Sequence, residues 1–311
     1  MNKATALLTT IMLLAVSCKK DEAGGPTPTP SPSTAPFQAY FEQNLIDATQ
    51  AFSVNAATGG TIFGAHGVEV SFIPNAFVTS AGTSASGTID VELVEVLDIP
   101  SMILMNKQAM GDDDGTLKPL VSGGQIKLIA SLAGEPLELV DNGSLITFPA
   151  SGGADPSMEV FYGTEATDGV VTWTPAPLDV TIYMDSGSVY QFFNDSLEWV
   201  NCDYFYEPGA TMTDVVATPP AGHDETNTVT WIVFTDNNAV ANLYHWVGGS
   251  LTTAPFYQLP VGLNITIVSL AAIGSEYRSC FVSTTISAGM NIPLSYNTTT
   301  LEQFEIDAQD L

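Results

Sequence analysis

Short stretches in which apolar and polar residues alternate, separated by turns rich in Gly, Asn and Asp, run through most of this chain. Clear examples are residues 68–73, 87–97 and 124–132. A period of two residues places the apolar side chains on one face of an extended strand, so this pattern predicts β-strands. The dipeptides Asn142-Gly143 and Asp168-Gly169 are typical of tight hairpin turns. We therefore expect an all-β fold.

A proline-rich tripeptide at 175–177 interrupts the strand pattern, and a second series of alternating stretches follows it. Because proline cannot serve in a central strand, we place a domain boundary here, with domains at 37–176 and 177–311. The number and spacing of the strands predict two β-sandwich or Greek-key domains in series. Helical spacing of apolar residues predicts a short helix after Pro36 and another over 299–311.

Residues 1–17 have the layout of a secretory signal peptide, in which Lys3 precedes an apolar run that ends at Val16. That run is too short to span a bilayer as a helix. The sequence Ala15-Val16-Ser17-Cys18 resembles the bacterial lipobox, whose cysteine is acylated and becomes the new N-terminus. The resemblance implies that Cys18 carries a lipid through which the protein binds the membrane. The alternative is an ordinary signal peptide followed by an unrelated cysteine.

The segment 18–36 alternates Pro with Thr and Ser over most of its length, which predicts an extended linker between the lipid anchor and the body. Its first charged residues, Lys19-Lys20-Asp21-Glu22, resemble the tetrads that follow the lipidated cysteine in surface-exported lipoproteins of Bacteroidota. This resemblance implies a protein anchored in the outer membrane, with its body displayed on the cell surface.

Acidic residues greatly outnumber basic ones: 34 against 7, which gives a formal net charge of −27. From residue 37 onward the only basic side chains are Lys107, Lys118, Lys127 and Arg278. Such a charge repels nucleic acids and anionic lipid headgroups, so we expect neither as a partner. It favours solubility in salt water and attracts divalent cations.

Two cysteines remain once Cys18 is assigned to the lipid. Cys202 and Cys280 belong to an exported body, where the oxidising environment allows a disulfide between them. Each also lies in an apolar, strand-like run, where a buried free thiol is common. The sequence leaves both alternatives open.

The stretch 60–77, GTIFGAHGVEVSFIPNAF, resembles the opening of a ZU5 domain, a β-sandwich found in ankyrins and netrin receptors. The resemblance covers about residues 52–97 and implies a scaffold. Some ZU5-containing proteins cleave themselves at a His-Phe-Ser step, and this sequence contains no such tripeptide. Two further pieces resemble parts of uncharacterised Bacteroidota-type lipoproteins: residues 95–98 with 102–104 and 122–124, and residues 199–205. This resemblance implies no activity.

Motifs of known enzyme classes do not occur in the sequence. His66, His223 and His245 are scattered, and there is no HExxH, no G-x-S-x-G and no Gly-rich phosphate loop before a helix. Glu95 shares the parity of the inward-facing residues of its strand, so it is either turned out by a bulge or buried with a specific partner. We favour a structural role for this carboxylate and predict a protein that is not an enzyme.

Two clusters are candidates for ligand binding. Trp199, Asn201 and Asp203 share one face of a strand, an arrangement that can hold a sugar by stacking and paired hydrogen bonds, or that simply belongs to the core. The run Asp112-Asp113-Asp114 lies between glycines, and it forms either a calcium site or the solvated tip of a hairpin. We predict no cofactor, unless these aspartates bind calcium.

Taken together, these features favour a lipid-anchored, non-enzymatic binding or assembly module of the cell envelope. Its partners would be other envelope proteins or extracellular glycans. The alternatives are a surface lipoprotein that binds or processes carbohydrate, and an adhesin that depends on calcium.

Overall fold

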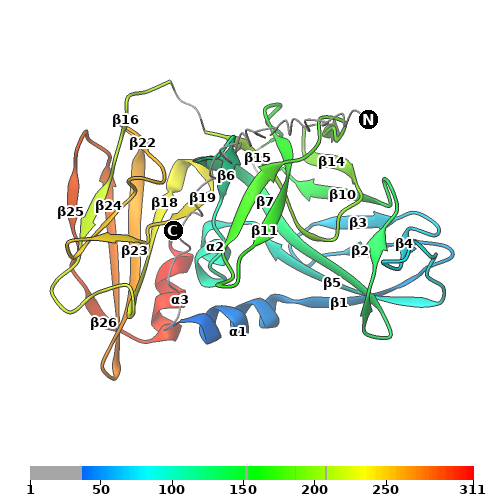
Figure 1. The fold of residues 1–311 in the computed structure, drawn as a ribbon, viewed down its shortest axis with the longest axis horizontal. Helices are drawn as coiled ribbons and strands as arrows, with labels where there is room; N and C mark the ends of the chain where they lie inside the picture. Colours follow the sequence, from blue (N-terminus) through cyan, green and yellow to red (C-terminus); the bar gives the residue numbers. More distant parts are fainter. Residues whose placement is uncertain (1–36, 151–152, 186, 207–208) are drawn as a thin grey trace, which may run out of the picture.

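The computed structural model describes residues 37–150, 153–185, 187–206 and 209–311. The predicted signal peptide, Cys18 and the predicted linker to residue 36 lie outside these residues. Most described residues belong to β-strands, and this confirms the all-β fold class (Figure 1). Helices α1 (Gln38–Ala48) and α3 (Leu301–Gln309) lie at the two ends, as expected, whereas α2 (Ile99–Leu104) was not anticipated.

The largest sheet, sheet A, contains eight strands. Seven follow the order β1-β5-β7-β15-β11-β12-β6, and β8 pairs with the end of β7. Neighbouring strands within sheet A are antiparallel, except that β12 and β6 pair in parallel over a short contact. The strands are β1 (Gln50–Asn55), β5 (Thr88–Val96), β6 (Met110–Asp113), β7 (Thr116–Leu132), β8 (Glu135–Pro136), β11 (Glu159–Glu165), β12 (Val171–Pro175) and β15 (Glu198–Phe205).

A second sheet, sheet B, packs against one face of sheet A to form a sandwich. Its order is β13-β14-β10-β3-β2, and a cluster of buried apolar side chains fills the space between the two sheets. A small pair of strands, β4 (Phe77–Val78) and β9 (Glu138–Leu139), lies beside it. The strands of sheet B are β2 (Gly60–Phe63), β3 (Glu69–Phe72), β10 (Ser144–Pro149), β13 (Tyr183–Asp185) and β14 (Val189–Asn194).

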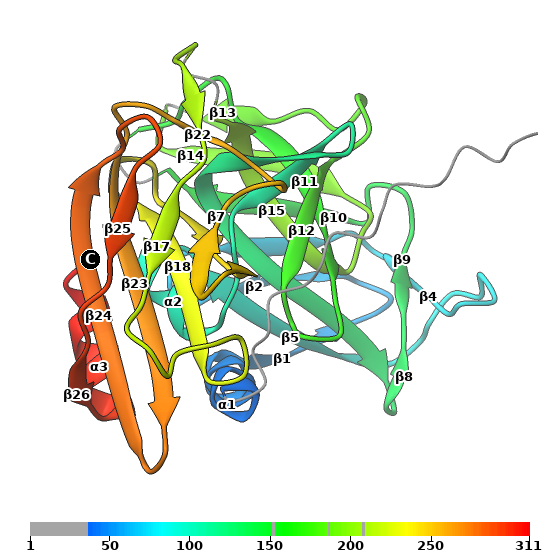
Figure 2. The same cartoon turned by 60° about the vertical axis from the view of Figure 1, so that its left-hand side comes forward.

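The remaining strands form three further sheets after residue 211. The five-stranded one contains a long antiparallel hairpin of β23 and β24, drawn in orange in Figure 2. The strands of the five-stranded sheet are, in order, β19 (Ala239–Asn242), β18 (Thr228–Phe234), β23 (Asn264–Ile273), β24 (Glu276–Thr285) and β26 (Asn297–Thr299). The four-stranded sheet contains β20 (His245–Val247), β21 (Ser250–Thr252), β17 (Val216–Thr218) and β25 (Asn291–Pro293). The third sheet is the pair β16 (Met212–Thr213) and β22 (Leu259–Pro260).

Strands before and after the proline-rich tripeptide at 175–177 belong to the same sheets. Strands β13, β14 and β15 all follow residue 177, yet β14 pairs with β10 and β15 pairs with both β7 and β11. Pro175 ends β12, so the prolines mark a loop within the first sandwich and the expected boundary at 176/177 is wrong for the sheets. We call residues 37–205 the N-terminal part and residues 212–311 the C-terminal part.

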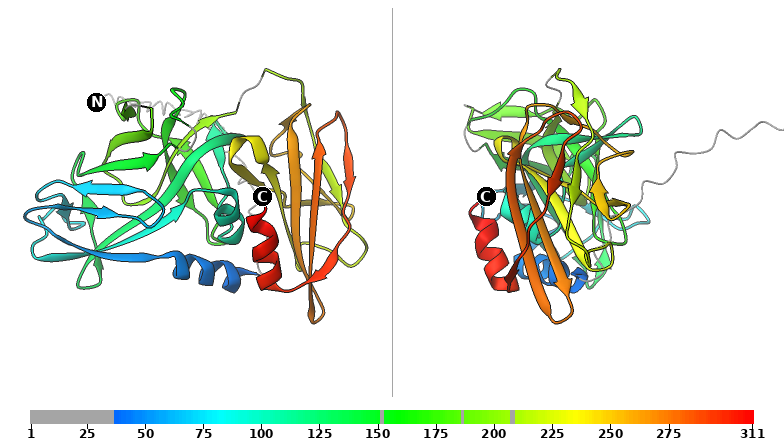
Figure 3. Two further views of the ribbon diagram at one scale, coloured as in Figure 1. Left: turned by 180° about the vertical axis from the view of Figure 1, so that it is seen from behind. Right: turned by 90° about the vertical axis from the view of Figure 1, so that its left-hand side faces the viewer.

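Around β15, sheet A is buried on both faces. The face turned away from sheet B shares one hydrophobic cluster with the helices and with the C-terminal strands. Trp231 of β18 illustrates this shared core, because its ring contacts Phe41 of α1 and Phe304 of α3. Its indole Nε1 also donates to Asn106 Oδ1 at 3.0 Å. Figure 3 shows α2 and α3 side by side between the strands of the two parts.

Both cysteines of the body are buried free thiols, so they do not form the disulfide that the sequence allowed. Cys202 lies on β15 of sheet A and Cys280 on β24 of the C-terminal part. Burial raises the pKa of both thiols, most strongly that of Cys202, and so keeps them protonated and unreactive.

We therefore expect the folded full-length Cys18→Ser variant to resist thiol labelling. In native buffer Ellman's reagent should find almost no reactive thiol, and in denaturant it should find two. Prompt labelling of either cysteine in native buffer would contradict the buried positions, and two unreactive thiols in denaturant without reductant would indicate a disulfide.

Candidate functional site

Two segments singled out in the sequence, 122–124 and 199–205, pair with each other at the centre of sheet A. Gln125 lies opposite Asn201 and Ser122 opposite Asp203, so two glycines of β7 face one residue of β15. This arrangement is a β-bulge. A Cβ on Gly123 would lie 2.7 Å from the carbonyl oxygen of Cys202, and one on Gly124 would lie 2.7 Å from Leu97. Both positions of the bulge therefore require glycine.

The sugar-binding interpretation of Trp199, Asn201 and Asp203 is wrong, because all three side chains belong to the core. Their exposed fractions are 1%, 0% and 0%. Asn201 Nδ2 donates to Asp203 Oδ2, and Ser122 Oγ donates to Asp203 Oδ1, each at 2.8 Å. Burial raises the pKa of Asp203 well above its usual range, and the Ser122 hydrogen bond opposes this rise. A sugar in solution cannot reach this face of β15.

The three aspartates at 112–114 form a hairpin tip. Asp113 makes an ion pair with Lys118 at 2.5 Å, and Asp112 Oδ1 accepts from the backbone N–H of Gly115 at 2.6 Å. Asp114 and Gly115 have positive φ angles of 51° and 87°, which suit a two-residue turn between β6 and β7. Within the described ranges, no group of three or more His, Cys, Asp or Glu side chains could hold a metal ion. The structure therefore supports the solvated turn and not the calcium site.

The sequence did not predict a partly buried ion cluster on the face of sheet A that is turned away from sheet B. Lys107 and Lys127 donate to the two oxygens of Glu165, each at 2.7 Å, and Trp199 Nε1 donates to the same carboxylate at 2.8 Å. Both ammonium groups also lie over the Trp199 ring. Burial acts to raise the pKa of Glu165, but the lysines and Trp199 outweigh it and lower that pKa to about 2. The carboxylate is thus ionised at neutral pH.

Every lysine and arginine of the described part of the chain is paired with a carboxylate. Lys107 and Lys127 share Glu165, Lys118 pairs with Asp113, and Arg278 pairs with Glu276 at 3.1 Å. No unpaired lysine or arginine therefore remains in these residues to attract an anion. The field around the body is negative, so it favours neutral or positively charged ligands.

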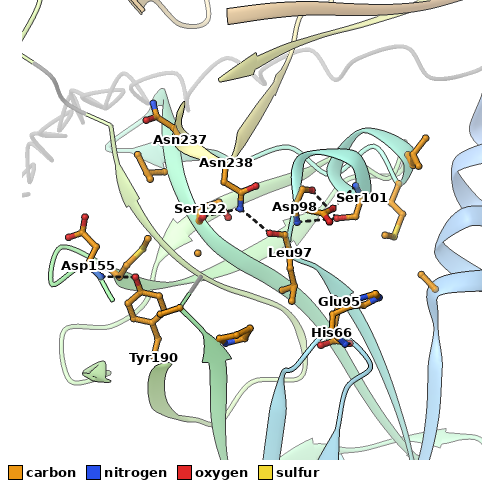
Figure 4. A pocket seen from close by; sticks show the side chains of 18 of the residues that line it. His66, Glu95, Leu97, Asp98, Ser101, Ser122, Asp155, Tyr190, Asn237 and Asn238 are labelled. Atoms are coloured by element: carbon orange, nitrogen blue, oxygen red, sulfur yellow. Dashed lines mark hydrogen bonds between the residues drawn. The ribbon is translucent and has the colours of Figure 1, made fainter. Parts of the chain in front are cut away.

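A cleft of about 930 Å³ lies where the N-terminal and C-terminal parts meet (Figure 4). The N-terminal part contributes α1, α2, the end of β5 and the loops around residues 66 and 155. The C-terminal part contributes residues 236–238 and the end of α3. Among the described residues that line the cleft, six are carboxylates and the only basic side chain is His66. The carboxylates are Asp47, Glu95, Asp98, Asp155, Asp236 and Glu305.

Glu95 is buried and has specific partners. No bulge turns its side chain outward, which was the other possibility. Its carboxylate accepts from the backbone N–H groups of His66 and Val68, each at 2.9 Å, and from Gln50 Nε2 at 2.8 Å. A Cβ on Gly64 would lie 2.5 Å from this carboxyl group. Glu95 thus fixes the loop at 64–68 against the end of β5, which is a structural role.

The opposite rim of the cleft is fixed in a comparable way. Asn238, with a φ of 45°, donates from its side-chain amide to the carbonyl oxygens of Leu97 and Ser122 at 2.9 and 3.1 Å. These bonds join the short η1 helix (Thr235–Asn237) to sheet A. On the other side, Tyr190 accepts from the backbone N–H of Asp155 at 2.7 Å. Figure 4 shows these bonds around the open centre of the cleft.

The other cleft carboxylates also accept hydrogen bonds from the protein. Asp98 caps α2 by accepting from the backbone N–H of Ser101. The remaining four accept from Gln43 (Asp47), Ser157 (Asp155), Asn264 (Asp236) and Tyr40 (Glu305). Hydrogen bonds of this kind hold a carboxylate in place and leave further lone pairs of its oxygens open to a ligand. The cleft therefore presents an array of positioned negative groups.

Comparisons with known proteins assign no family to this arrangement. No protein-family model matches the chain, and no curated protein is significantly similar to it in sequence. Among the described residues, no helix is both long and apolar enough to cross a membrane. The resemblance of residues 52–97 to a ZU5 domain accordingly stays a prediction from the sequence.

Proposed function

We propose that this protein is a lipid-anchored, non-enzymatic binding module of the outer membrane, and that its cleft holds a positively charged segment of another cell-envelope protein. Cys18 carries the lipid in this proposal, and the Pro-rich linker separates the anchor from the body. The ZU5-like stretch is part of the scaffold, and the N-terminal and C-terminal parts form the two walls of the binding site.

The observation that carries this proposal is the charge of the cleft. Six carboxylates line it, in a protein whose described lysines and arginines are all paired elsewhere. A lysine or arginine side chain entering the cleft gains attraction to several carboxylates that are already positioned by the protein. Such preorganisation reduces the entropic cost of binding.

The carboxylates of the cleft are held in fixed positions. Each of the six accepts a hydrogen bond from a neighbouring backbone or side-chain group. An array of negative groups whose geometry is set before the ligand arrives suits the binding of a cationic segment. This arrangement favours a binding module.

The test is binding of a fluorescein-labelled octalysine peptide to the full-length protein, purified in a neutral detergent. The Asp155→Asn/Asp236→Asn double variant removes one charge from each wall of the cleft and keeps the side-chain shapes. We expect it to bind at least about tenfold more weakly, equivalent to about 1.4 kcal/mol. The measurement is fluorescence anisotropy at low and physiological salt.

The matched control is the Asp90→Asn/Glu92→Gln double variant, which changes the same net charge on exposed positions of β5 away from the cleft. It should bind octalysine almost as tightly as the unmodified protein. Equal weakening in the two double variants would show a diffuse charge effect and would contradict a site in the cleft.

A further inference from the structure

A second surface of the protein carries aromatic, hydroxyl and amide side chains where the cleft carries carboxylates. The outer face of sheet B, turned away from sheet A, carries two rows of side chains that run across its strands. The strand register places them opposite one another within each row. The first row is Thr61, Ser71, Leu145 and Phe193, and the second is Phe63, Glu69, Thr147, Gln191 and Tyr183.

Three aromatic rings project from this face into solvent. The exposed fractions of Phe63, Tyr183 and Phe193 are 66%, 56% and 43%. In the described part of the chain only one other aromatic side chain, Tyr277, is comparably exposed. Phe63 lies on β2 and Tyr183 on β13, the two edge strands of the sheet, and Phe193 lies on β14, the strand that pairs with β13. Rings exposed on one face of a sheet, at both of its edges, can together contact an extended ligand that lies across the strands.

The side chains between the rings are hydroxyls and amides. Thr61 Oγ1 and Ser71 Oγ share a hydrogen bond of 2.8 Å, and Gln191 Nε2 donates to Thr147 Oγ1 at 3.1 Å. These bonds hold the polar groups within the plane of the sheet and leave further donor and acceptor positions open. The face thus alternates apolar rings with groups that can hydrogen-bond a polyol.

The outer face of sheet B carries few charged groups, and this restricts the kind of ligand that it can bind. Glu69 is the only ionisable carboxylate or amine in the two rows, in a chain whose formal net charge is −27. A charged partner would find no complementary array here. A second copy of the chain would bring an equally negative body against this one, and like charges oppose that association. A neutral polymer meets neither penalty.

We propose that the outer face of sheet B binds a neutral polysaccharide. Sugar rings present apolar C–H faces that stack on aromatic rings, and equatorial hydroxyls that reach the Thr, Ser and Gln side chains between them. An extended polymer can contact several rings at once, so weak individual contacts add to a useful affinity. This site is separate from the cleft and replaces the buried Trp199 stretch as the place where glycan is held.

The experiment is co-sedimentation of the full-length protein, in neutral detergent, with insoluble cellulose, chitin and starch granules. The test variant is Phe63→Ala/Tyr183→Ala/Phe193→Ala, whose substitutions fall on exposed side chains. The matched control is Val247→Ala, an exposed apolar residue of the C-terminal part (58% exposed). We expect at least one polysaccharide to retain the unmodified protein and the control, and the apparent affinity of the triple variant to fall at least about tenfold.

The proposal is overturned if none of the three polysaccharides retains the protein, or if the triple variant is retained as well as the control. It is also overturned if the unmodified protein sediments as a dimer that the triple variant abolishes, because the face would then bind a second copy. Thermal unfolding of each variant shows whether the fold is intact, and the single variant Phe193→Trp should still bind the polysaccharide.

The octalysine assay measures binding in the cleft and does not depend on the outer face of sheet B. A negative result for one site therefore leaves the proposal for the other site unaffected.

Discussion

Replacing Glu165 by alanine is expected to destabilise the protein by about 3 kcal/mol, the lower end of the usual cost of removing one partner from a buried ion pair, because the Glu165 side chain is 24% exposed. The Lys107 side chain, 3% exposed, would lose its carboxylate partner, and the charge of Lys127 would remain close by. Trp199 would lose its acceptor as well. Urea unfolding monitored by tryptophan fluorescence measures the change. A loss below about 1 kcal/mol, the value typical of surface pairs, would contradict the importance of this cluster.

The same cluster predicts a dependence of stability on pH. The pKa of Glu165 falls from an ordinary 4.5 to about 2 in the folded state. A carboxylate with a lowered folded-state pKa contributes stability that is complete above its unfolded pKa and is lost as the pH falls through the folded value. The stability difference between the unmodified protein and Glu165→Gln should therefore be largest above pH 4.5 and narrow toward pH 2.

Unfolding of both proteins between pH 6 and 3 tests this dependence, with Glu92→Gln as the control at an exposed position of β5. The control should differ little from the unmodified protein across the range. A difference for Glu165→Gln that stays constant with pH would indicate that Glu165 acts through packing and not through its charge.

Replacing Trp231 by alanine is expected to cost about 3–5 kcal/mol and to loosen the junction of the two parts. This ring is buried between Phe41 of α1 and Phe304 of α3, and its indole N–H donates to Asn106 in the loop after α2. The substitution would leave a cavity where the C-terminal strands meet the helices. Because the walls of the cleft come from both parts, the affinity for octalysine should fall as well.

Trp231→Phe is the matched control, since it keeps an aromatic ring and removes the hydrogen bond to Asn106. Its cost should be smaller, about 1 kcal/mol for the bond. Equal losses for alanine and phenylalanine would assign the effect to the hydrogen bond alone. An unchanged stability of Trp231→Ala would contradict a core shared by the two parts.

The fold class followed from the alternating pattern because alternation reports one buried face of a strand. The alternating pattern failed on β15, where residues 199–203 are buried without interruption, because this part of sheet A is covered on both faces. The parity of Glu95 left two alternatives, a bulge or a buried carboxylate with a specific partner, and the structure shows the second. Two of its partners lie in a loop 27 and 29 residues earlier, which no local pattern could reveal. The prolines at 175–177 suggested a boundary because they end a strand, and strand ends occur within sandwiches as well as between them.

The sites that the sequence did not reveal are assembled from distant segments. Glu165 lies 58 residues from Lys107 and 38 from Lys127, so no local spacing connects them. The scarcity of basic residues was the one available signal, because few cations in an acidic chain suggest that each is paired. The cleft draws on both ends of the body, from Asp47 of α1 to Glu305 of α3. Only the packing of the two parts brings these groups together.

Hydrogen–deuterium exchange of the full-length protein with and without saturating octalysine tests the central claim most directly. The account predicts slower exchange at residues 95–101 and 153–158 of the N-terminal part, and at 236–238 and 305–309 of the C-terminal part. Protection on both walls would place the ligand in the cleft. Protection confined to one part, or to the strands of sheet B, would contradict a binding site formed where the two parts meet.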